Sequence, residues 1–291
     1  MLEVLFGSDK ALSYENVKCL TNFTPFFTFL LVQYLDGLYN KNSSFVFTDF
    51  TNLVIQYVPP VKLVWYPVAL CIIPIVMIFG SFSFFIIFPE QCDLLLTASV
   101  GKQKALLEQN NVFLDEYRVR SDIYYNTFLN LLMSPLTHLA EGFAIESVFR
   151  GYIFLSLINS LHPRIACIIT GAIFGFYSIA LTILGEGFDV AYFGEPFTGM
   201  VCTFLVHFFL NGIFCFFALK TKSMLICGFL SSAWIALQKN YLPFVTTVFD
   251  QTSPFYGPSY HGIIPASPII LTSFVLFFYM GWEAESPFEL K

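Results

Sequence analysis

The sequence predicts an all-α protein, a polytopic membrane helix bundle with roughly seven or eight spans. Of its 291 residues, 56% are hydrophobic and only 12% are charged, and the mean hydropathy is +0.70. A soluble domain cannot bury that much apolar surface, so lipid must be the solvent for most of it. This composition excludes a soluble enzyme. The net charge of −6, with no aromatic-and-basic stripe, argues against a nucleic-acid partner.

We expect the N-terminal region, residues 1–122, to hold one or two spans and a polar cytoplasmic loop. Residues 63–88 contain no charged side chain and are long enough to cross a bilayer with tilt. Pro67 and Pro74 should kink this helix. The apolar run at residues 23–35 is shorter, so it either spans or lies at the interface.

The loop at residues 89–122 is polar, and its 105–115 portion is typical of a short polar helix. Residues 1–12 lack a basic region followed by an apolar core, so we expect no cleavable signal peptide.

The remainder divides into a membrane core at residues 123–240 and a loop with a C-terminal span at residues 241–291. Six apolar runs mark the expected helices. They lie at residues 123–140, 143–161, 165–184, 197–219, 223–237 and 264–282.

Basic loops favour the cytoplasmic side, which sets the expected orientation. If residues 123–161 cross twice, with a break near Glu141-Gly142, then Arg164, Lys220 and Lys222 are cytoplasmic together with the basic loop before residue 123. The acidic loop at residues 186–195 then lies opposite. A single crossing inverts this arrangement and fits the rule less well, and Pro135 leaves a re-entrant helix open.

The seven cysteines are spread along the chain and form no Cys-x-x-Cys pair. Most lie in apolar runs, where cysteine acts as a small packing residue. They therefore indicate nothing about the redox compartment.

The most informative motif places Glu146 and Arg150 one helical turn apart inside an apolar run. At this spacing the two side chains meet on one face of a helix. Ionisable groups inside a membrane are expensive, usually paired, and functional by default. The alternative interpretation is a structural ion pair that fixes helix packing.

Three motifs in order resemble those of a known family. Glu146-Ser-Val-Phe-Arg150 is similar to the Glu-Glu-x-x-x-Arg signature of the type II CAAX prenyl proteases, within the wider family of CAAX proteases and bacteriocin-processing proteins. Residues 172–178 resemble its Phe-Gly-x-x-His signature. Residues 211–223 resemble the helix and basic turn before the third signature, His-x-x-x-Asn, which residues 231–235 would occupy. The resemblance covers residues 123–237.

This resemblance implies an endopeptidase of the endoplasmic reticulum membrane that removes the last three residues of prenylated CAAX proteins. Its partners would be prenylated protein C-termini and the lipid bilayer. In the family, paired glutamates activate a water, and the histidine and asparagine positions hold that water and stabilise the oxyanion. Such a role suits a carboxylate in a dry cavity with preorganised donors.

The chain departs from the family pattern at four polar positions. Ile145 replaces the first glutamate, Ser178 and Ser231 replace the two histidines, and Ile235 replaces the asparagine. Catalytic units fail non-additively, so these losses should remove nearly all of the rate enhancement. The sequence thus predicts a family fold whose chemistry has decayed or been repurposed, with Glu146 and Arg150 as the surviving site residues.

Two other polar pairs could supply missing groups. His207 and Asn211, four residues apart, could reach the cavity of Glu146, or they could join helices by hydrogen bonds. His138 and Glu141 could act likewise from the preceding segment. The cofactor is unknown, and a metal held by Glu146, His207 and Asn211 stays open although no His-Glu-x-x-His pattern occurs. His162 and His261 are expected in loops.

Three functions therefore compete. The first is a divergent CAAX-type endopeptidase, and the second is an inactive relative that binds or scaffolds prenylated or membrane proteins. The third is a small transporter, ranked last because the polar residues cluster at one depth. Location in the endoplasmic reticulum follows from the resemblance and from the sequon Asn42-Ser43-Ser44.

Overall fold

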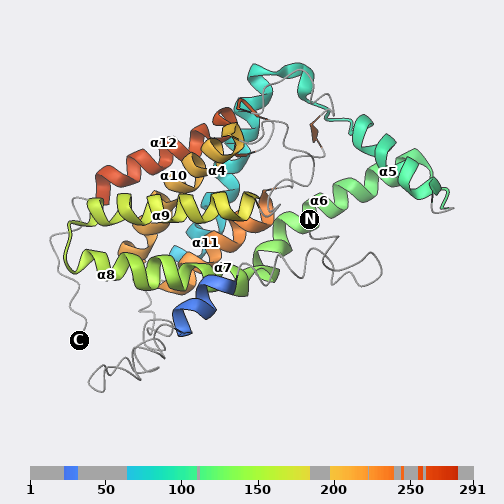
Figure 1. Cartoon of the computed structure of the whole chain (residues 1–291). Helices are drawn as coiled ribbons and strands as arrows, with labels where there is room; N and C mark the ends of the chain where they lie inside the picture. The colour runs from blue at the N-terminus through green and yellow to red at the C-terminus, as the bar shows by residue number, and fades with distance from the viewer. Residues whose placement is uncertain are drawn as a thin grey trace.

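The predicted all-α class is confirmed by the computed structural model of the chain (Figure 1). The structure describes residues 23–31, 64–109, 112–183, 197–221, 223–238, 244–245, 255–257 and 260–280. Within these ranges the chain is helical apart from turns and one isolated antiparallel bridge between Cys92 and Val245. Several sequence predictions fall outside them: the Asn42 sequon, the acidic loop at residues 186–195, Lys222 and the first 22 residues.

The helices follow the predicted runs closely from residue 163 onward. The bounds of all the labelled helices are α4 Trp65–Ile87, η2 Pro89–Gln91, α5 Thr97–Gln109, α6 Glu116–Thr137, α7 Leu139–Glu146, η3 Ser147–Phe154, α8 Leu155–Ile158, α9 Pro163–Ile183, α10 Phe197–Thr221, α11 Met224–Leu237 and α12 Ile263–Met280.

Four of the described helices are long and apolar enough to cross a membrane: α4, α9, α10 and α12. The chain is thus an integral membrane protein, but the predicted seven or eight spans are not confirmed. Two of the other predicted runs do not qualify as spans over their described residues, for physical reasons. Helix α11 has only 14 residues, a length of about 21 Å. The first half of α6 carries charged side chains, among them Arg118 and Asp122.

Helix α10 is the centre of the bundle. It packs on α9, α11, α12 and η3, and 61% of its most apolar stretch is buried, against 28–39% for the other three spans. In Figure 1, α9 and α12 lie on either side of α10, with α11 and α4 behind. The main apolar core joins α4, α10, α11 and α12, with Phe214, Leu230 and Ile269 fully buried.

The segments α7, η3 and α8 form one continuous helical rod, because the residues at both junctions, Ser147 and Leu155, keep right-handed helical angles. The middle of this rod, Ser147–Phe154, is a π-helix. The break from α6 falls at His138 rather than near Glu141-Gly142 as predicted. Residues 123–161 thus form parts of two helices, and both α6 and α7 pack on α11.

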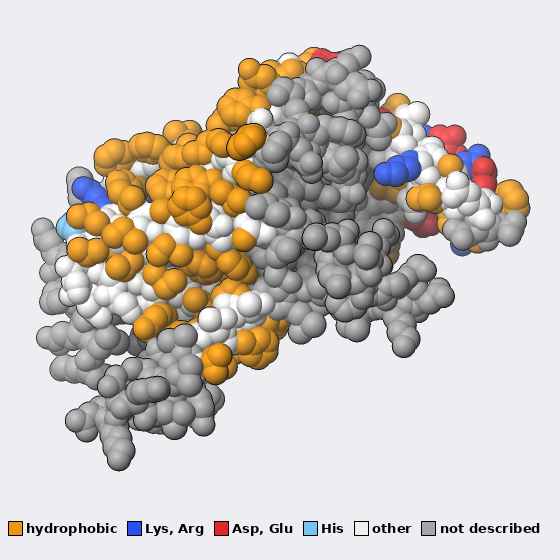
Figure 2. Space-filling model, viewed as in Figure 1, with side chains coloured by type: hydrophobic (Ala, Val, Ile, Leu, Met, Phe, Trp, Pro, Cys, Tyr) orange, Lys and Arg blue, Asp and Glu red, His pale blue; other side chains and the backbone are white. Residues whose placement is uncertain are grey.

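Helix α5 and the first part of α6 extend away from the bundle as an arm, and the rest of α6 returns to pack on α11 (Figure 1). Helix α5 spans Thr97–Gln109, so the short helix predicted at residues 105–115 begins earlier and ends before residue 110. The early start has a local cause: the Asp93 carboxylate accepts a hydrogen bond from the Ala98 backbone N–H at 2.9 Å, which caps the helix. Figure 2 shows charged side chains on this arm and mostly apolar ones over the bundle.

The short N-terminal run is also helical over its described part, residues 23–31. These nine described residues extend about 14 Å. Phe29 is buried, and its ring lies 4.9 Å from the ring of Tyr152 on the π-helical segment. This helix therefore packs against the rod.

Helix α7 approaches α11 through glycine. A Cβ atom added to Gly142 would lie 2.6 Å from the Gly228 carbonyl oxygen and 2.6 Å from the Ser232 backbone nitrogen. No side chain fits between these backbones, so the glycine permits the close contact. This contact sets the position of Glu146, one turn further along α7, against α11.

We expect Gly142→Ala to destabilise the protein by about 1–3 kcal/mol, because the added methyl group meets backbone atoms that cannot rotate away. Thermal unfolding in detergent micelles measures the change. The matched control is Gly101→Ala on α5, where an added Cβ meets nothing within 4 Å. Equal melting temperatures for the two variants would contradict the close α7–α11 contact.

Candidate active site

Glu146 and Arg150 form an ion pair at the centre of the bundle. The Nη1 atom of Arg150 donates a hydrogen bond to Oε1 of Glu146 at 3.0 Å, and both side chains are 0% exposed. Glu146 ends α7, and Arg150 follows on the π-helical segment. Such segments occur frequently at functional sites. The pairing predicted from the i, i+4 spacing is therefore present.

Aromatic rings enclose the guanidinium group of Arg150. Its central carbon lies 4.4 Å from the ring centroid of Phe174 on α9 and 4.8 Å from that of Phe214 on α10. The ring of Phe149 is 5.8 Å away. Aromatic faces stabilise a cation, most strongly when it is removed from water. One carboxylate and three aromatic rings therefore stabilise the positive charge of Arg150.

Several polar atoms in this region are buried without a partner that meets hydrogen-bond geometry. They are Oε2 of Glu146, Nε and Nη2 of Arg150, and Nε1 of Trp234. An unsatisfied buried polar group costs about 1–3 kcal/mol. The ion pair is therefore under-satisfied in its hydrogen bonds.

The two serines at the family's histidine positions have different surroundings. Ser231 on α11 contributes a side-chain hydrogen bond to the Glu146 carboxyl group. Ser178 on α9 donates to the Phe174 carbonyl at 2.9 Å, within its own helix. Both side chains are buried. The structure thus brings Ser231 to Glu146, while the hydroxyl group of Ser178 bonds to the backbone one turn earlier.

The two isoleucines at the family's glutamate and asparagine positions belong to one apolar cluster. Ile145, Phe149 and Phe174 are its buried members, and Ile235 packs against them. The residues come from α7, η3, α9 and α11. Where the family pattern places a carboxylate and an amide, this chain has close-packed hydrocarbon.

His207 lies in the same interior but does not bond to Glu146. Its Nδ1 atom pairs with the Thr203 carbonyl oxygen at 2.9 Å, and because a carbonyl only accepts, Nδ1 carries the proton. The neutral ring then presents Nε2 as an acceptor. The Phe174 ring lies 5.4 Å from the imidazole and 4.4 Å from the Arg150 guanidinium, so it contacts both groups.

His261 is a neighbour of this site that the sequence interpretation missed. It lies in a turn before α12, as expected for a loop residue, but it is buried and its ring stacks on His207 at 5.6 Å. Trp234 of α11 stands edge-on to both imidazoles. Burial, with a smaller effect of His207, lowers the pKa of His261 to about 3. Nothing in the local sequence signals this contact, because it joins residues 54 positions apart (261 − 207).

Asn211 links α9 and α10. Its side-chain nitrogen donates to the Cys167 carbonyl at 2.9 Å, and Cys215 donates its thiol to Oδ1 at 3.5 Å. These contacts fit the helix-joining role considered above for His207 and Asn211. Asn211 bonds to these cysteines, which are packing residues here.

His138 and Glu141 form a separate pair at the start of α7, with 2.8 Å between Nδ1 and Oε2. Glu141 lies five residues before Glu146, about 7.5 Å along the helix. Among the described residues, no group of three or more His, Cys, Asp or Glu side chains is placed to hold a metal ion. Neither pair therefore extends the Glu146 site into a metal centre.

The fold and site define a class of protein: a helical membrane bundle with a buried carboxylate–guanidinium pair where α7, α9, α10 and α11 meet. Residues 127–237 match the family described as type II CAAX prenyl endopeptidase Rce1-like. This match confirms the predicted resemblance and includes every helix that contributes to the pair. No curated protein matches the chain.

We expect Arg150→Met to destabilise the protein by about 3–5 kcal/mol, because it leaves the Glu146 charge buried and unpaired. The double variant Glu146→Met with Arg150→Met should regain most of this loss. Unfolding by a denaturing detergent, analysed as a double-mutant cycle, measures the coupling. Arg120→Met removes an exposed pair of the same spacing, Arg120–Glu116 at 2.7 Å, and should change stability by less than about 1 kcal/mol. Additive effects at 146 and 150 would contradict the pairing.

The depressed pKa of His261 predicts a loss of stability in acid. The unfolded chain binds a proton at a pKa near 6.5 and the folded chain only near 3, so the free energy of unfolding falls as pH decreases through this window. Between about pH 7 and about pH 5, His261→Phe should lose about 1–2 kcal/mol less than the parent protein. The exposed His162→Phe serves as control. Parallel pH curves for the parent and His261→Phe would refute the burial effect.

Proposed function

We propose that this protein is a catalytically inactive relative of the type II CAAX prenyl endopeptidases, which binds prenylated protein C-termini in the endoplasmic reticulum membrane without cleaving them. The observation that carries the proposal is the apolar cluster of Ile145, Ile235, Phe149 and Phe174. The two isoleucines stand at polar positions of the family pattern and pack into one cluster. The two polar side chains are thus replaced together by apolar ones that belong to the same cluster.

The chemistry of amide hydrolysis explains why this cluster opposes catalysis. A water must be deprotonated, and donors must meet the oxyanion as it forms. Isoleucine can do neither. The remaining carboxyl group, Glu146, is bonded to Arg150 and Ser231, and its side chain is fully buried. A substrate carbonyl would therefore meet hydrocarbon beside a neutralised carboxylate.

A divergent endopeptidase is the second candidate, and one observation favours it. Oε2 of Glu146 is buried without a partner, so it has a lone pair free to accept a proton from water. His207 also keeps Nε2 as an acceptor in the same interior. The Phe174 ring contacts the His207 imidazole and the Arg150 guanidinium, so His207 lies beside the ion pair.

A transporter has less support. Such proteins need polar groups along several spans to form a path. Among the described residues, the buried charged side chains, Glu141, Glu146 and Arg150, all lie on α7 and η3 rather than along several spans.

The test is a cleavage and binding assay with the purified full chain and a fluorescent farnesylated CAAX peptide. An active family member is the positive control for cleavage, and the same peptide without its farnesyl group is the control for binding. We expect no cleavage above background and saturable binding of the farnesylated peptide. The Glu146→Gln variant keeps an oxygen acceptor for Arg150, and where it is folded we expect it to bind the farnesylated peptide as the parent protein does.

Cleavage that disappears in the Glu146→Gln variant would overturn the proposal in favour of the endopeptidase. Equal binding of the prenylated and unprenylated peptides by a folded protein would overturn the partner class. Circular dichroism and a monodisperse elution profile establish that each variant is folded.

A further inference from the structure

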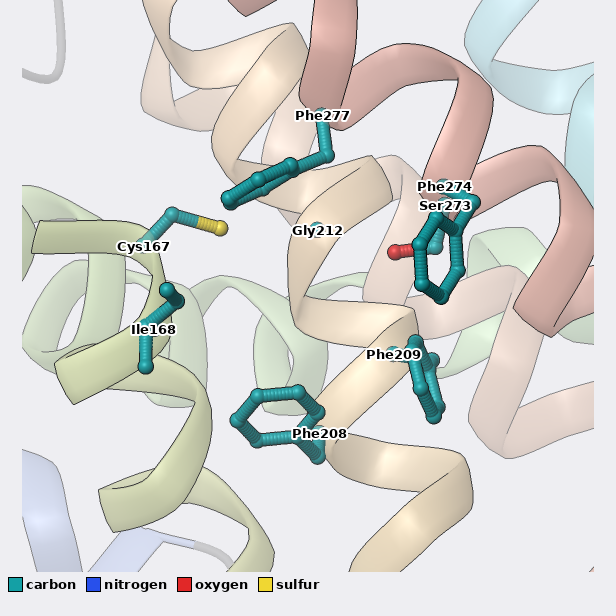
Figure 3. A pocket seen from close by; sticks show the side chains of 8 residues that line it. All are labelled: Cys167, Ile168, Phe208, Phe209, Gly212, Ser273, Phe274 and Phe277. Carbon is teal, nitrogen blue, oxygen red and sulfur yellow. The ribbon is translucent and has the colours of Figure 1, made fainter. Parts of the chain in front are cut away.

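An apolar groove lies on the membrane-facing side of the bundle, away from Glu146. It has a volume of about 280 Å³ and is lined by residues of α9, α10 and α12. Figure 3 shows the floor formed by α10 and the two walls formed by α9 and α12. The lining residues are Cys167, Ile168, Phe208, Phe209, Gly212, Ser273, Phe274 and Phe277.

The groove opens laterally into the hydrocarbon layer. Its wall residues Ile168 and Phe274 are 47% and 50% exposed, and all three helices are spans of the bundle. Four phenylalanine rings line it, and the packing of Gly212 against Ser273 brings α12 close to α10 at its base. A flexible hydrocarbon chain suits such a site, because it can enter from the bilayer without crossing water.

A cation stands at the end of this groove. Arg164 lies on α9 one turn, about 5.4 Å, before Ile168, at the end of the span where α9 begins. Its guanidinium carbon is 5.9 Å from the ring centroid of Phe277, a groove residue. Figure 2 shows basic side chains at this end of an otherwise apolar face.

The guanidinium group of Arg164 has donors to spare. Within the described part of the chain it donates one hydrogen bond, from Nη2 to the Phe278 carbonyl at 2.7 Å, and Nε is buried without a partner. A guanidinium carries five N–H donors and matches phosphate oxygens well. The N-terminal end of the 21-residue helix α9 adds a favourable field for an anion.

We propose that this groove binds one acyl chain of an anionic phospholipid, whose phosphate group pairs with Arg164. The site matches such a lipid in its order of groups. Arg164 at the end of the span would meet the phosphate, and the apolar groove, which begins one helical turn further along α9, would hold the acyl chain. This inference does not depend on whether the protein cleaves or binds prenylated partners.

The experiment uses the full chain in nanodiscs containing phosphatidylglycerol and phosphatidylcholine, with retained lipids counted by native mass spectrometry. We expect phosphatidylglycerol to be retained about fivefold more strongly, the factor that one basic contact supplies. Arg164→Gln should abolish this preference, and Arg164→Lys should keep most of it. Ile168→Trp should fill the groove and release the lipid.

Ile173→Trp is the matched control, because Ile173 is 41% exposed on the same helix and does not line the groove. Equal retention of the two lipids by the parent protein, or equal lipid loss in the two tryptophan variants, would overturn the proposal. So would displacement of the bound lipid by a farnesylated peptide at stoichiometric concentration, which would assign the groove to a prenyl chain.

Arg164 also caps the end of α12, so its variants could unfold, and a second measurement avoids substitution. Phosphatidylglycerol with a diazirine in its acyl chain is cross-linked to the parent protein, and the labelled peptides are identified. Labels concentrated on the parts of α9 and α12 that line the groove support the site. Labels spread evenly over all the spans refute it.

Discussion

Removing Glu146 and Arg150 from water carries a large penalty, which their single hydrogen bond of 3.0 Å and the surrounding aromatic rings must offset. The pair imposes conditions on four helices at once. Helix α7 must approach α11 closely enough for Ser231 to reach the carboxylate, and α9 and α10 must supply Phe174 and Phe214 to the guanidinium. Gly142 makes the first approach possible. The packing of the bundle is therefore organised around one charge pair.

The same region separates the contacts that stabilise the bundle from the positions that the resemblance assigns to catalysis. The ion pair, the glycine contact and the aromatic enclosure hold the helices together. The resemblance aligns Ile145 with a glutamate that activates water and Ile235 with an asparagine that stabilises the oxyanion, and here both isoleucines add to the apolar packing. Under the proposed function, stability and catalysis thus rest on different side chains, so the first can be kept without the second. The unpartnered atoms of Glu146, Arg150 and Trp234 mark where the packing is still imperfect.

The helices after residue 163 could be predicted because each is a long apolar run bounded by polar or turn residues. The contact of Glu146 with Arg150 followed from their spacing alone. Other features were out of reach of the sequence. The π-helix at Ser147–Phe154 has no distinct residue pattern. The turn falls at His138, between Pro135 and Gly142, and a histidine does not by itself signal a helix break. The stacking of His261 on His207 depends on tertiary packing that no local motif encodes.

The shared cluster of Ile145 and Ile235 also bears on the history of the chain. A single reversion of either isoleucine to its polar counterpart would put an unsatisfied carboxyl or amide group among Phe149 and Phe174. Under the proposed function, each isoleucine is therefore costly to replace on its own, and hydrolysis would have to be regained against the packing of this cluster.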